Sequence, residues 1–473
     1  MRHHPQMALD TIKSFLTARP SVNDRLISGK ALRKKTPRSA LGEFKVRANR
    51  QDAVRIMAAQ AKSRISDLVP IRHARMAENP FAFYRGGAAL MAQDLSDLPP
   101  ASIMVQLCGD MHVSNFGFFS TTERQLVFGI NDFDETLPGH FDWDLKRLAA
   151  SAMIAAEHLG QDQVYGENLI HLMARSYCLN MIQYANMSYA ELARTYIDQT
   201  TLAARAKQID ALSQEFVAKQ IEKARKNTNQ GVLDKLTHKT PNGRKIIDSP
   251  PLITHRDTTV SGNSVIDRLD EGLKTYARSL ASDRRHVLMR YRLVDWARKV
   301  VGVGSVGTAC WILYLEGIDD KDPLFLQSKE AQRSVLAPYF SDRGFRTQGE
   351  RIVQGQRLIQ GAPDLFLGYG ATREKELYVR QLRDMKGGVA IGEGGIGVDE
   401  FPDYARLFGW ALANAHARSG DPALLAGYCG KGDQLGEALV QFSAAYNQQN
   451  AADYDQFCKA IKQGKLPCAT DNY

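Results

Sequence analysis

Three absences narrow what this chain of 473 residues can be. Its cysteines form no CxxC pair and show no regular spacing, which argues against a zinc site or a disulfide framework. The longest apolar run, LAASAMIAA, is far too short to span a bilayer, and the opening MRHHPQMALD lacks the apolar core of a signal peptide. We therefore expect reduced thiols in a soluble cytoplasmic protein without a membrane partner. The cysteines are Cys108, Cys178, Cys310, Cys429, Cys458 and Cys468.

The excess positive charge of this chain lies entirely in its first 50 residues. Residues 1–50 contain twelve Lys or Arg and three Asp or Glu, so they account for the whole formal net charge of +9. Such a basic N-terminal arm could engage nucleic acid, an acidic partner or a phosphorylated ligand, or it could simply be solvated or loosely docked. No nucleic-acid-binding motif occurs elsewhere in the sequence, so a nucleic acid is not the expected partner.

The length predicts more than one lobe, because a chain of this size exceeds what a single hydrophobic core usually holds. Helical patterns dominate the first half, where Asn79-Pro80 gives a helix start signal, a cap followed by Pro at the first position. A β-branched and glycine-punctuated texture follows, and the last residues are helical again. We predict these divisions: a basic arm at 1–50, a catalytic lobe at 51–200, a helical and hairpin insertion at 201–285, a β-rich nucleotide-binding lobe at 286–387, and C-terminal helices at 388–473 that complete the catalytic lobe.

The stretch VVGVGSVGT places Gly302, Gly304 and Gly307 at the spacing GxGxxG, with Ser305 between them. A dinucleotide-binding turn has this spacing, but it must run into a helix. Here the glycines run into TACWILYLEG, which favours a strand. A glycine-rich turn between two antiparallel strands is typical of the loop that covers ATP in protein kinases.

Two charged residues follow the glycines in the order that an ATP site needs. Lys329 ends the next predicted strand, in LFLQSK, where it could bind the α- and β-phosphates. Glu350 lies on the helix after that, where we expect it to pair with Lys329 and hold it in place. Each residue alone has an ordinary explanation as a surface lysine or a solvated helix face, so the ordered set is what favours the ATP site.

The octapeptide CGDMHVSN supplies a candidate catalytic loop. Kinase-like enzymes need an Asp that orients and deprotonates the attacking hydroxyl and, five residues later, an Asn that binds the metal. Asp110 and Asn115 have that spacing. After one further strand, NDFDE supplies Asp132 as a second metal ligand and Asp134 as an auxiliary ligand. The expected cofactors are therefore ATP and Mg²⁺.

These motifs resemble those of the aminoglycoside-phosphotransferase branch of the protein-kinase-like superfamily, whose catalytic loop is similar to HGDxHxxN and whose metal strand is similar to IDFD. Cys108 replaces the first His of that loop. The blocks FAFYRGGAALMAQDL, NDFDETLPGHFDWDLKRLA and QGERIVQGQRL are also similar to a bacterial family known as domain of unknown function 2252, over roughly residues 30–460. In ordinary kinases the glycine loop precedes the catalytic loop. The resemblance therefore implies a circularly permuted, two-lobed kinase-like α+β fold, with a mostly helical catalytic lobe and a small β-rich ATP lobe.

Alternatives remain open for the function. The loop GDxHxxN resembles a metallophosphatase GDxHG loop, although no later GDxxDR or GNH motif occurs. A pseudokinase that binds nucleotide as a switch is the non-enzymatic alternative. The acceptor hydroxyl is unidentified: the DFD strand favours a small molecule, while the basic arm leaves a protein or anionic acceptor open. Arg72, Arg75 and Arg85 could line an anionic pocket or brace carboxylates such as Asp142 and Asp144.

Overall fold

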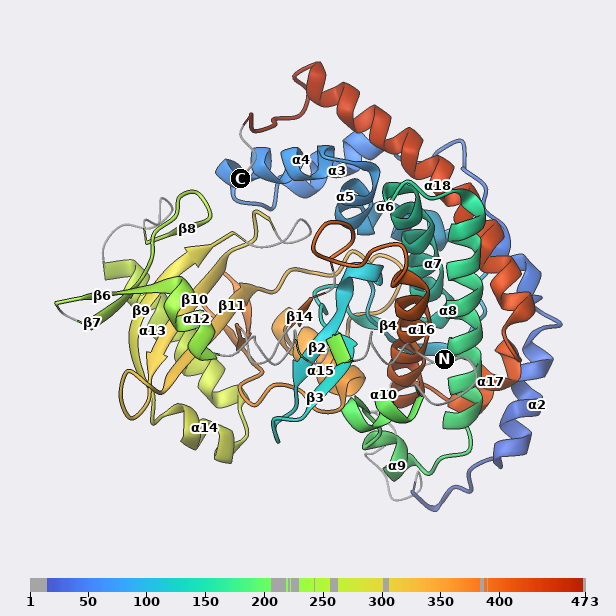
Figure 1. The fold of residues 1–473 in the computed structure, drawn as a ribbon, viewed down its shortest axis with the longest axis horizontal. Coiled ribbons are helices and arrows are strands. Elements are labelled where there is room, and N and C mark those ends of the chain that lie inside the picture. Colours follow the sequence, from blue (N-terminus) through green and yellow to red (C-terminus); the bar gives the residue numbers. More distant parts are fainter. Residues whose placement is uncertain are drawn as a thin grey trace.

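The structure, a computed structural model, is a mixed α+β protein with 50% helix and 16% strand, as the sequence predicts for its class (Figure 1). No helix in the part of the chain that it describes is long and apolar enough to cross a membrane. All six cysteines are unpaired, as expected. The described residues are 15–205, 218–219, 222, 229–241, 243–255, 263–300, 306–382, 387–388 and 390–470.

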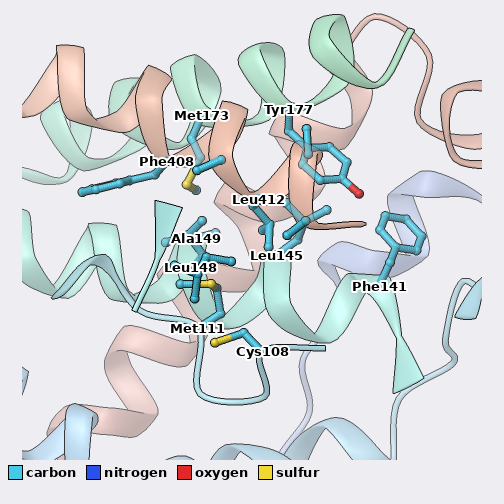
Figure 2. Close-up of a cluster of buried hydrophobic side chains, with 14 of the residues drawn as sticks. Cys108, Met111, Phe141, Leu145, Leu148, Ala149, Met173, Tyr177, Phe408 and Leu412 are labelled. Carbon is cyan, nitrogen blue, oxygen red and sulfur yellow. The ribbon is translucent and has the colours of Figure 1, made fainter. Parts of the chain in front are cut away.

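Long helices form the larger part of the molecule (Figure 1). Helix α7 is buried from its first residue to Ala156, because α8, α16 and α18 surround it. Figure 2 shows aliphatic, aromatic and sulfur-containing side chains of α7, α8 and α16 filling the space between these helices. The helices span Phe141–His158 (α7), Gln163–Tyr184 (α8), Phe401–Ser419 (α16), Pro422–Cys429 (α17) and Asp433–Lys462 (α18).

The described part of the basic arm docks onto the C-terminal helices. Arg33 donates hydrogen bonds to the carbonyl oxygens of Gly427 and Tyr428 at the end of α17. Arg50 bridges Asp94 and Asp453, with nitrogen–oxygen distances of 2.6 and 2.7 Å. These arginines therefore contribute to the fold. The arm contains α2 (Val22–Leu32) and the 3₁₀ helix η2 (Arg38–Gly42).

Short helices between residues 51 and 96 follow the arm, as the sequence predicts. The Asn79 side chain accepts a hydrogen bond from the Ala82 amide and Pro80 occupies the first helical position, so the expected start signal of α5 is confirmed. Short helices also follow α8. The bounds are Ala53–Ala61 (α3), Ser66–Leu68 (η3), Val69–Ala77 (α4), Pro80–Gly86 (α5), Ala88–Ser96 (α6), Tyr189–Ala193 (α9) and Gln199–Arg205 (α10).

Two small antiparallel sheets carry the loops CGDMHVSN and NDFDE. Strand β1 pairs with β4, and a second sheet has the order β14-β2-β3-β5. Strand β2 was not predicted, because its FGFFS is buried throughout and has no alternating pattern. The bounds are Met104–Leu107 (β1), Val113–Asn115 (η4), Phe116–Ser120 (β2), Leu126–Ile130 (β3), Leu137–His140 (β4), Ile197–Asp198 (β5) and Gly387–Gly388 (β14).

A six-stranded antiparallel sheet forms the β-rich part of the molecule, at the left of Figure 1. Its order is β12-β13-β11-β10-β9-β8, and α13 packs on the β12 end through Tyr276. The predicted hairpin of the insertion is present as β6–β7. The bounds are Thr237–Thr240 (β6), Gly243–Ile246 (β7), Ile253–Thr254 (β8), Arg292–Lys299 (β9), Cys310–Glu316 (β10), Pro323–Glu330 (β11), Gly368–Ala371 (β12), Glu376–Gln381 (β13), Asn229–Leu236 (α12), Asn263–Ser279 (α13), Ser282–Leu288 (α14) and Gln348–Gln360 (α15).

Candidate functional site

The loop CGDMHVSN is held in a fixed shape by the helix that follows it. Asp144 in the first turn of α7 accepts hydrogen bonds from the amides of Cys108, at 2.7 Å, and Gly109, at 3.0 Å. Gly109 has a φ of 88°, and a Cβ atom there would clash with the carbonyl oxygen of Glu135. Cys108 and Met111 point from the loop into the core beside α7 (Figure 2). The loop is therefore rigid, and it presents Asp110 on its polar side.

One oxygen of Asp110 is anchored, whereas the other makes no hydrogen bond with a described residue. Arg147 on α7 donates from Nε to Asp110 Oδ1 over 2.7 Å. Asp110 Oδ2 lies 3.9 Å from His112 Nε2, beyond hydrogen-bond distance. Burial raises the pKa of the Asp110 carboxyl, and the charge of Arg147 opposes that rise. The result is an oriented carboxylate with one oxygen able to accept a proton, which is the geometry of a general base.

Asn115 adjoins Asp110, as the spacing predicts. Its Nδ2 donates to the backbone carbonyl of Asp110 over 2.6 Å, and its own carbonyl accepts from the Asn131 amide over 2.8 Å. The side chain is buried, and this bond commits its nitrogen. The side-chain oxygen is therefore the atom that could ligate a metal. The same contacts tie the loop to the segment that carries Asp132.

The NDFDE segment lies directly against the CGDMHVSN loop. The Cys108 thiol donates to the Asp132 carbonyl, with an Sγ–O distance of 3.0 Å. Asp132 Oδ1 accepts only a long bond, 3.3 Å, from the Asp134 amide. The charge of Asp132 also acts on Asp110 and on Lys329, so the three groups share one electrostatic environment. Asp132 is partly exposed.

Asp134 is engaged differently from the expectation that it is an auxiliary metal ligand. Its Oδ2 lies 2.7 Å from Lys329 Nζ, and its Oδ1 accepts a hydrogen bond from the Tyr378 hydroxyl. Burial would raise the pKa of the Asp134 carboxyl, but the ammonium of Lys329 outweighs burial and holds this pKa far below its usual range. With both oxygens occupied, Asp134 serves here as the partner of the lysine.

Lys329 lies on β11 and is 3% exposed. Burial opposes its charge, yet the neighbouring Asp134 raises its pKa, so Lys329 is an ammonium ion. The predicted pair between Lys329 and Glu350 is wrong. The Glu350 carboxylate accepts from the Arg346 amide at 2.8 Å and from Gln354 Nε2 at 3.0 Å, so it faces its own helix. Thr347 caps α15 and Glu350 is the third residue of the first turn, the usual place for a capping carboxylate.

The helix α15 instead turns Arg351 toward the site. Arg351 is fully buried and donates to the carbonyl oxygens of Thr136 at 2.6 Å and of Asp134 and Gln332 at 2.9 Å each. It therefore joins the NDFDE segment to the chain that leaves β11. Arg351 was not predicted, because the inward position on this helix was assigned to Glu350. The capping signature TQGE, read as such, would have shown that Glu350 faces away.

The glycine motif can be followed only in part, because Gly302, Gly304 and Ser305 lie outside the described residues. The strands on either side of the motif, β9 and β10, form an antiparallel pair. A dinucleotide-binding turn at a helix start is therefore excluded here. Gly307 has a φ of 90°, and its carbonyl accepts from the Ile65 amide at 2.8 Å. The end of the turn thus docks on the segment between α3 and α4.

Three further polar or ionisable groups, Tyr378, Arg380 and Glu135, lie at the site and were not singled out from the sequence. Tyr378 and Arg380 on β13 face the site, and Arg380 donates to the Asn131 carbonyl at 3.0 Å. Burial raises the pKa of Glu135 to about 7. Alternation along a strand could have indicated the two β13 residues, because Tyr378 and Arg380 share one face and pair with Lys329 and Gln327 on β11.

The arginines before the catalytic loop have separate environments. Arg72 is buried and donates to the Gly86 carbonyl at 3.0 Å, so it braces α4 against α5. Arg85 experiences the charges of Asp110 and Asp132, and its buried Nε has no hydrogen-bond partner among the described residues. Arg72 therefore braces the backbone and not a carboxylate such as Asp142 or Asp144, whereas Arg85 lies where the charges of Asp110 and Asp132 act on it.

The donor set can be tested against the expected Mg²⁺. Within the described ranges, no group of three or more His, Cys, Asp or Glu side chains could hold a metal ion. Mg²⁺, however, is usually held by one or two carboxylates together with substrate phosphates, and amide oxygens also suit it. Asp132 and Asn115 fit such a shared site. They do not fit the two-metal site of a metallophosphatase, which needs several Asp and His ligands.

Comparison with known proteins identifies a family but no activity. Residues 64–460 match the family described as "Uncharacterized protein conserved in bacteria (DUF2252)". Neither the curated proteins nor the solved structures gave a match.

Proposed function

The chain belongs to the DUF2252 family of bacterial proteins, and we propose that it is an ATP- and Mg²⁺-dependent phosphotransferase that moves the γ-phosphoryl group to a hydroxyl of an unidentified acceptor. The observation that carries this proposal is the assembly of Asp110, Asp132 and Lys329 around one polar site. These residues come from a helical and a β-rich part of the fold and are far apart in sequence. A basic group, a metal-binding carboxylate and a candidate base are the minimum set for phosphoryl transfer.

Element order supports a kinase-like fold in circularly permuted order. The antiparallel pair β9–β10 flanks the glycine turn, β11 carries the lysine, and α15 follows it, which is the order of the parts that cover and bind ATP in protein kinases. Here these elements come after the catalytic loop in the chain. A circular permutation changes the order of the elements along the chain but not how they pack, so the same site can form.

We assign each described residue a role in transfer. Asp110 accepts the proton of the incoming hydroxyl at Oδ2, while Arg147 fixes the carboxylate through Oδ1. Lys329 releases Asp134 and binds phosphate oxygens of ATP instead, because the phosphate group carries more negative charge than the carboxylate. Gly307 belongs to the turn that covers the phosphates. Arg85 contributes a further positive charge near Asp110 and Asp132.

Asp132 and the side-chain oxygen of Asn115 would hold Mg²⁺. The ion, when bound, neutralises the charge on the phosphate oxygens. Asp144 keeps the catalytic loop in register with these ligands, because it fixes the backbone of Cys108 and Gly109. The small-molecule acceptor expected from the sequence is part of the proposal.

Nucleotide binding gives the first test. Mg-ATP at millimolar concentration should raise the melting temperature of the wild type, because a ligand that binds only the folded state stabilises it by mass action. Lys329→Met should reduce that rise, measured as the difference with and without Mg-ATP for each variant. Equal rises for Glu350→Gln and wild type serve as the control, because Glu350 faces its own helix. A wild-type melting temperature unchanged by Mg-ATP would refute the proposal.

A further inference from the structure

A cavity of ≈ 440 Å³ lies behind the Asp132 segment. It is enclosed by the β2–β3 hairpin, the end of α15, the start of β11 and the end of β13. Its volume is in the range of small-molecule binding sites. Asp110, Asp132 and Lys329 do not line it, but Asn131 and Arg380 do. The cavity is therefore separate from the proposed phosphotransfer site and shares a wall with it.

Side-chain amides form the inner wall of the cavity. Gln356 Nε2 donates to Gln360 Oε1 at 2.9 Å, and Gln360 Nε2 donates to the Ile130 carbonyl at 2.8 Å. These two hydrogen bonds leave Gln356 Oε1 without a hydrogen-bond partner among the described residues. Asn131 is only 9% exposed, and neither atom of its amide has a partner in that same part of the chain. Buried amide groups are normally satisfied, so these atoms point to a ligand that would satisfy them.

The chemistry of the ligand follows from these atoms. An Asn amide presents one donor and one acceptor side by side, and such amides bind the edge of a planar group with the complementary pair, as Asn and Gln do with adenine. Phe119, Tyr291 and Phe366 also line the cavity and offer aromatic faces for a planar ring. The inner end of the cavity therefore suits a planar group with a donor–acceptor edge.

The lining of the cavity carries one more positive than negative charge, because Arg124, Lys321 and Arg380 stand against Asp322 and Asp364. Arg124 and Lys321 line the cavity and are exposed. The carboxylates in the lining already accept local hydrogen bonds: Asp322 from the Tyr291 hydroxyl at 3.1 Å and Asp364 from the Phe366 amide at 2.8 Å. An anionic group at the rim would thus meet cations whose charge the carboxylates only partly compensate.

We propose that this cavity is a regulatory site for a small anion with a planar donor–acceptor edge, which is the chemistry of a mononucleotide. Arg380 donates to the Asn131 carbonyl at 3.0 Å, and Asn131 immediately precedes Asp132. A ligand bound to the Asn131 amide therefore biases the position of the Asp132 carboxylate. The binding site stands on its own geometry, whereas its effect on turnover rests on the proposed function.

Adenosine monophosphate is the probe for the test, titrated calorimetrically into the full chain without Mg-ATP. Gln356→Leu should weaken its binding by about tenfold or more, because a buried acceptor for the ligand is lost. Gln354→Leu, on the same helix but outside the cavity, should leave binding unchanged. Lys321→Ala should weaken the binding of the monophosphate but not of adenosine, with Lys274→Ala as the matched surface control.

Thr122→Trp provides a second variant that fills the cavity from its partly exposed rim and spares the buried amides. It should abolish binding of the monophosphate while the melting temperature stays unchanged. No binding to the wild type at millimolar concentration would overturn the proposal. So would binding that Lys329→Met weakens and Gln356→Leu does not, because the probe would then occupy the phosphotransfer site. Adenosine or inorganic phosphate binding as tightly as the monophosphate would overturn the ligand class.

Discussion

Lys329 and Asp134, 195 positions apart in the chain, form an ion pair with an Nζ–Oδ2 distance of 2.7 Å. The pair joins β11 to the NDFDE segment and lies beside the carboxylate of Asp132. It gives the lysine a partner within the protein that a phosphate group would have to replace.

Removing only one charge of this ion pair should lower the free energy of unfolding. Lys329→Met leaves the Asp134 carboxylate, whose side chain is 28% exposed, without its cation, and this should lower the free energy of unfolding by at least about 2 kcal/mol in urea titrations. The double variant Lys329→Met, Asp134→Leu removes both charges and should recover most of that loss. A single variant that loses less than about 1 kcal/mol would show that the pair behaves like an exposed salt bridge.

Neighbouring residues of α15 should respond very differently to substitution. Arg351→Leu removes three hydrogen bonds to backbone carbonyls and should lower the free energy of unfolding by at least about 3 kcal/mol. Glu350→Gln keeps a side-chain oxygen for the cap and should change it by no more than about 0.5 kcal/mol. The comparison fails if Glu350→Gln is the more damaging variant, as a pair with Lys329 would require.

Arg147 should act on turnover through the orientation of Asp110. Arg147→Lys keeps the positive charge but loses the planar group that donates to Asp110 Oδ1 and to the Tyr84 carbonyl. Misplacement of the base by a small distance should lower the ATP turnover rate by about a hundredfold. The affinity for Mg-ATP, measured by calorimetry, should stay at the wild-type value. Equal losses of both quantities would indicate a general structural role.

Because of Glu135, we expect the free energy of unfolding to depend on pH. Its carboxyl has a pKa raised by burial to about 7, compared with 4.5 for an exposed glutamate. The folded state therefore favours the protonated form, so this contribution is fully present below pH 4.5 and is lost as the pH rises to about 7. Glu135→Gln should flatten the decrease in unfolding free energy between about pH 5 and pH 8 in urea titrations. An unchanged slope would assign the decrease to other groups.

Local patterns predicted much of the fold and part of the site. Asn79-Pro80 marked a helix start, and the β-type residues after the glycines excluded a helix there. The spacing of Asp110 and Asn115 identified two residues that are in contact. The predicted partner of Lys329, Glu350, was wrong. Asp132, Asp134 and Glu350 were all candidates, and which carboxylate reaches the ammonium group depends on tertiary packing. Asp134 reaches it because Arg351 fixes the backbone of the NDFDE segment.

The most direct test compares Asp110→Asn and Asp132→Asn with the wild type, by measuring Mg-dependent ATP affinity and basal ATP turnover. Asp132→Asn should weaken Mg-dependent ATP binding and reduce turnover, because it removes the charge that holds the ion. Asp110→Asn should leave binding nearly intact and lower turnover by roughly two to four orders of magnitude, the usual contribution of a positioned base. Turnover insensitive to Asp110→Asn would contradict the account, and wild-type binding of Mg-ATP without turnover would favour a nucleotide-binding switch.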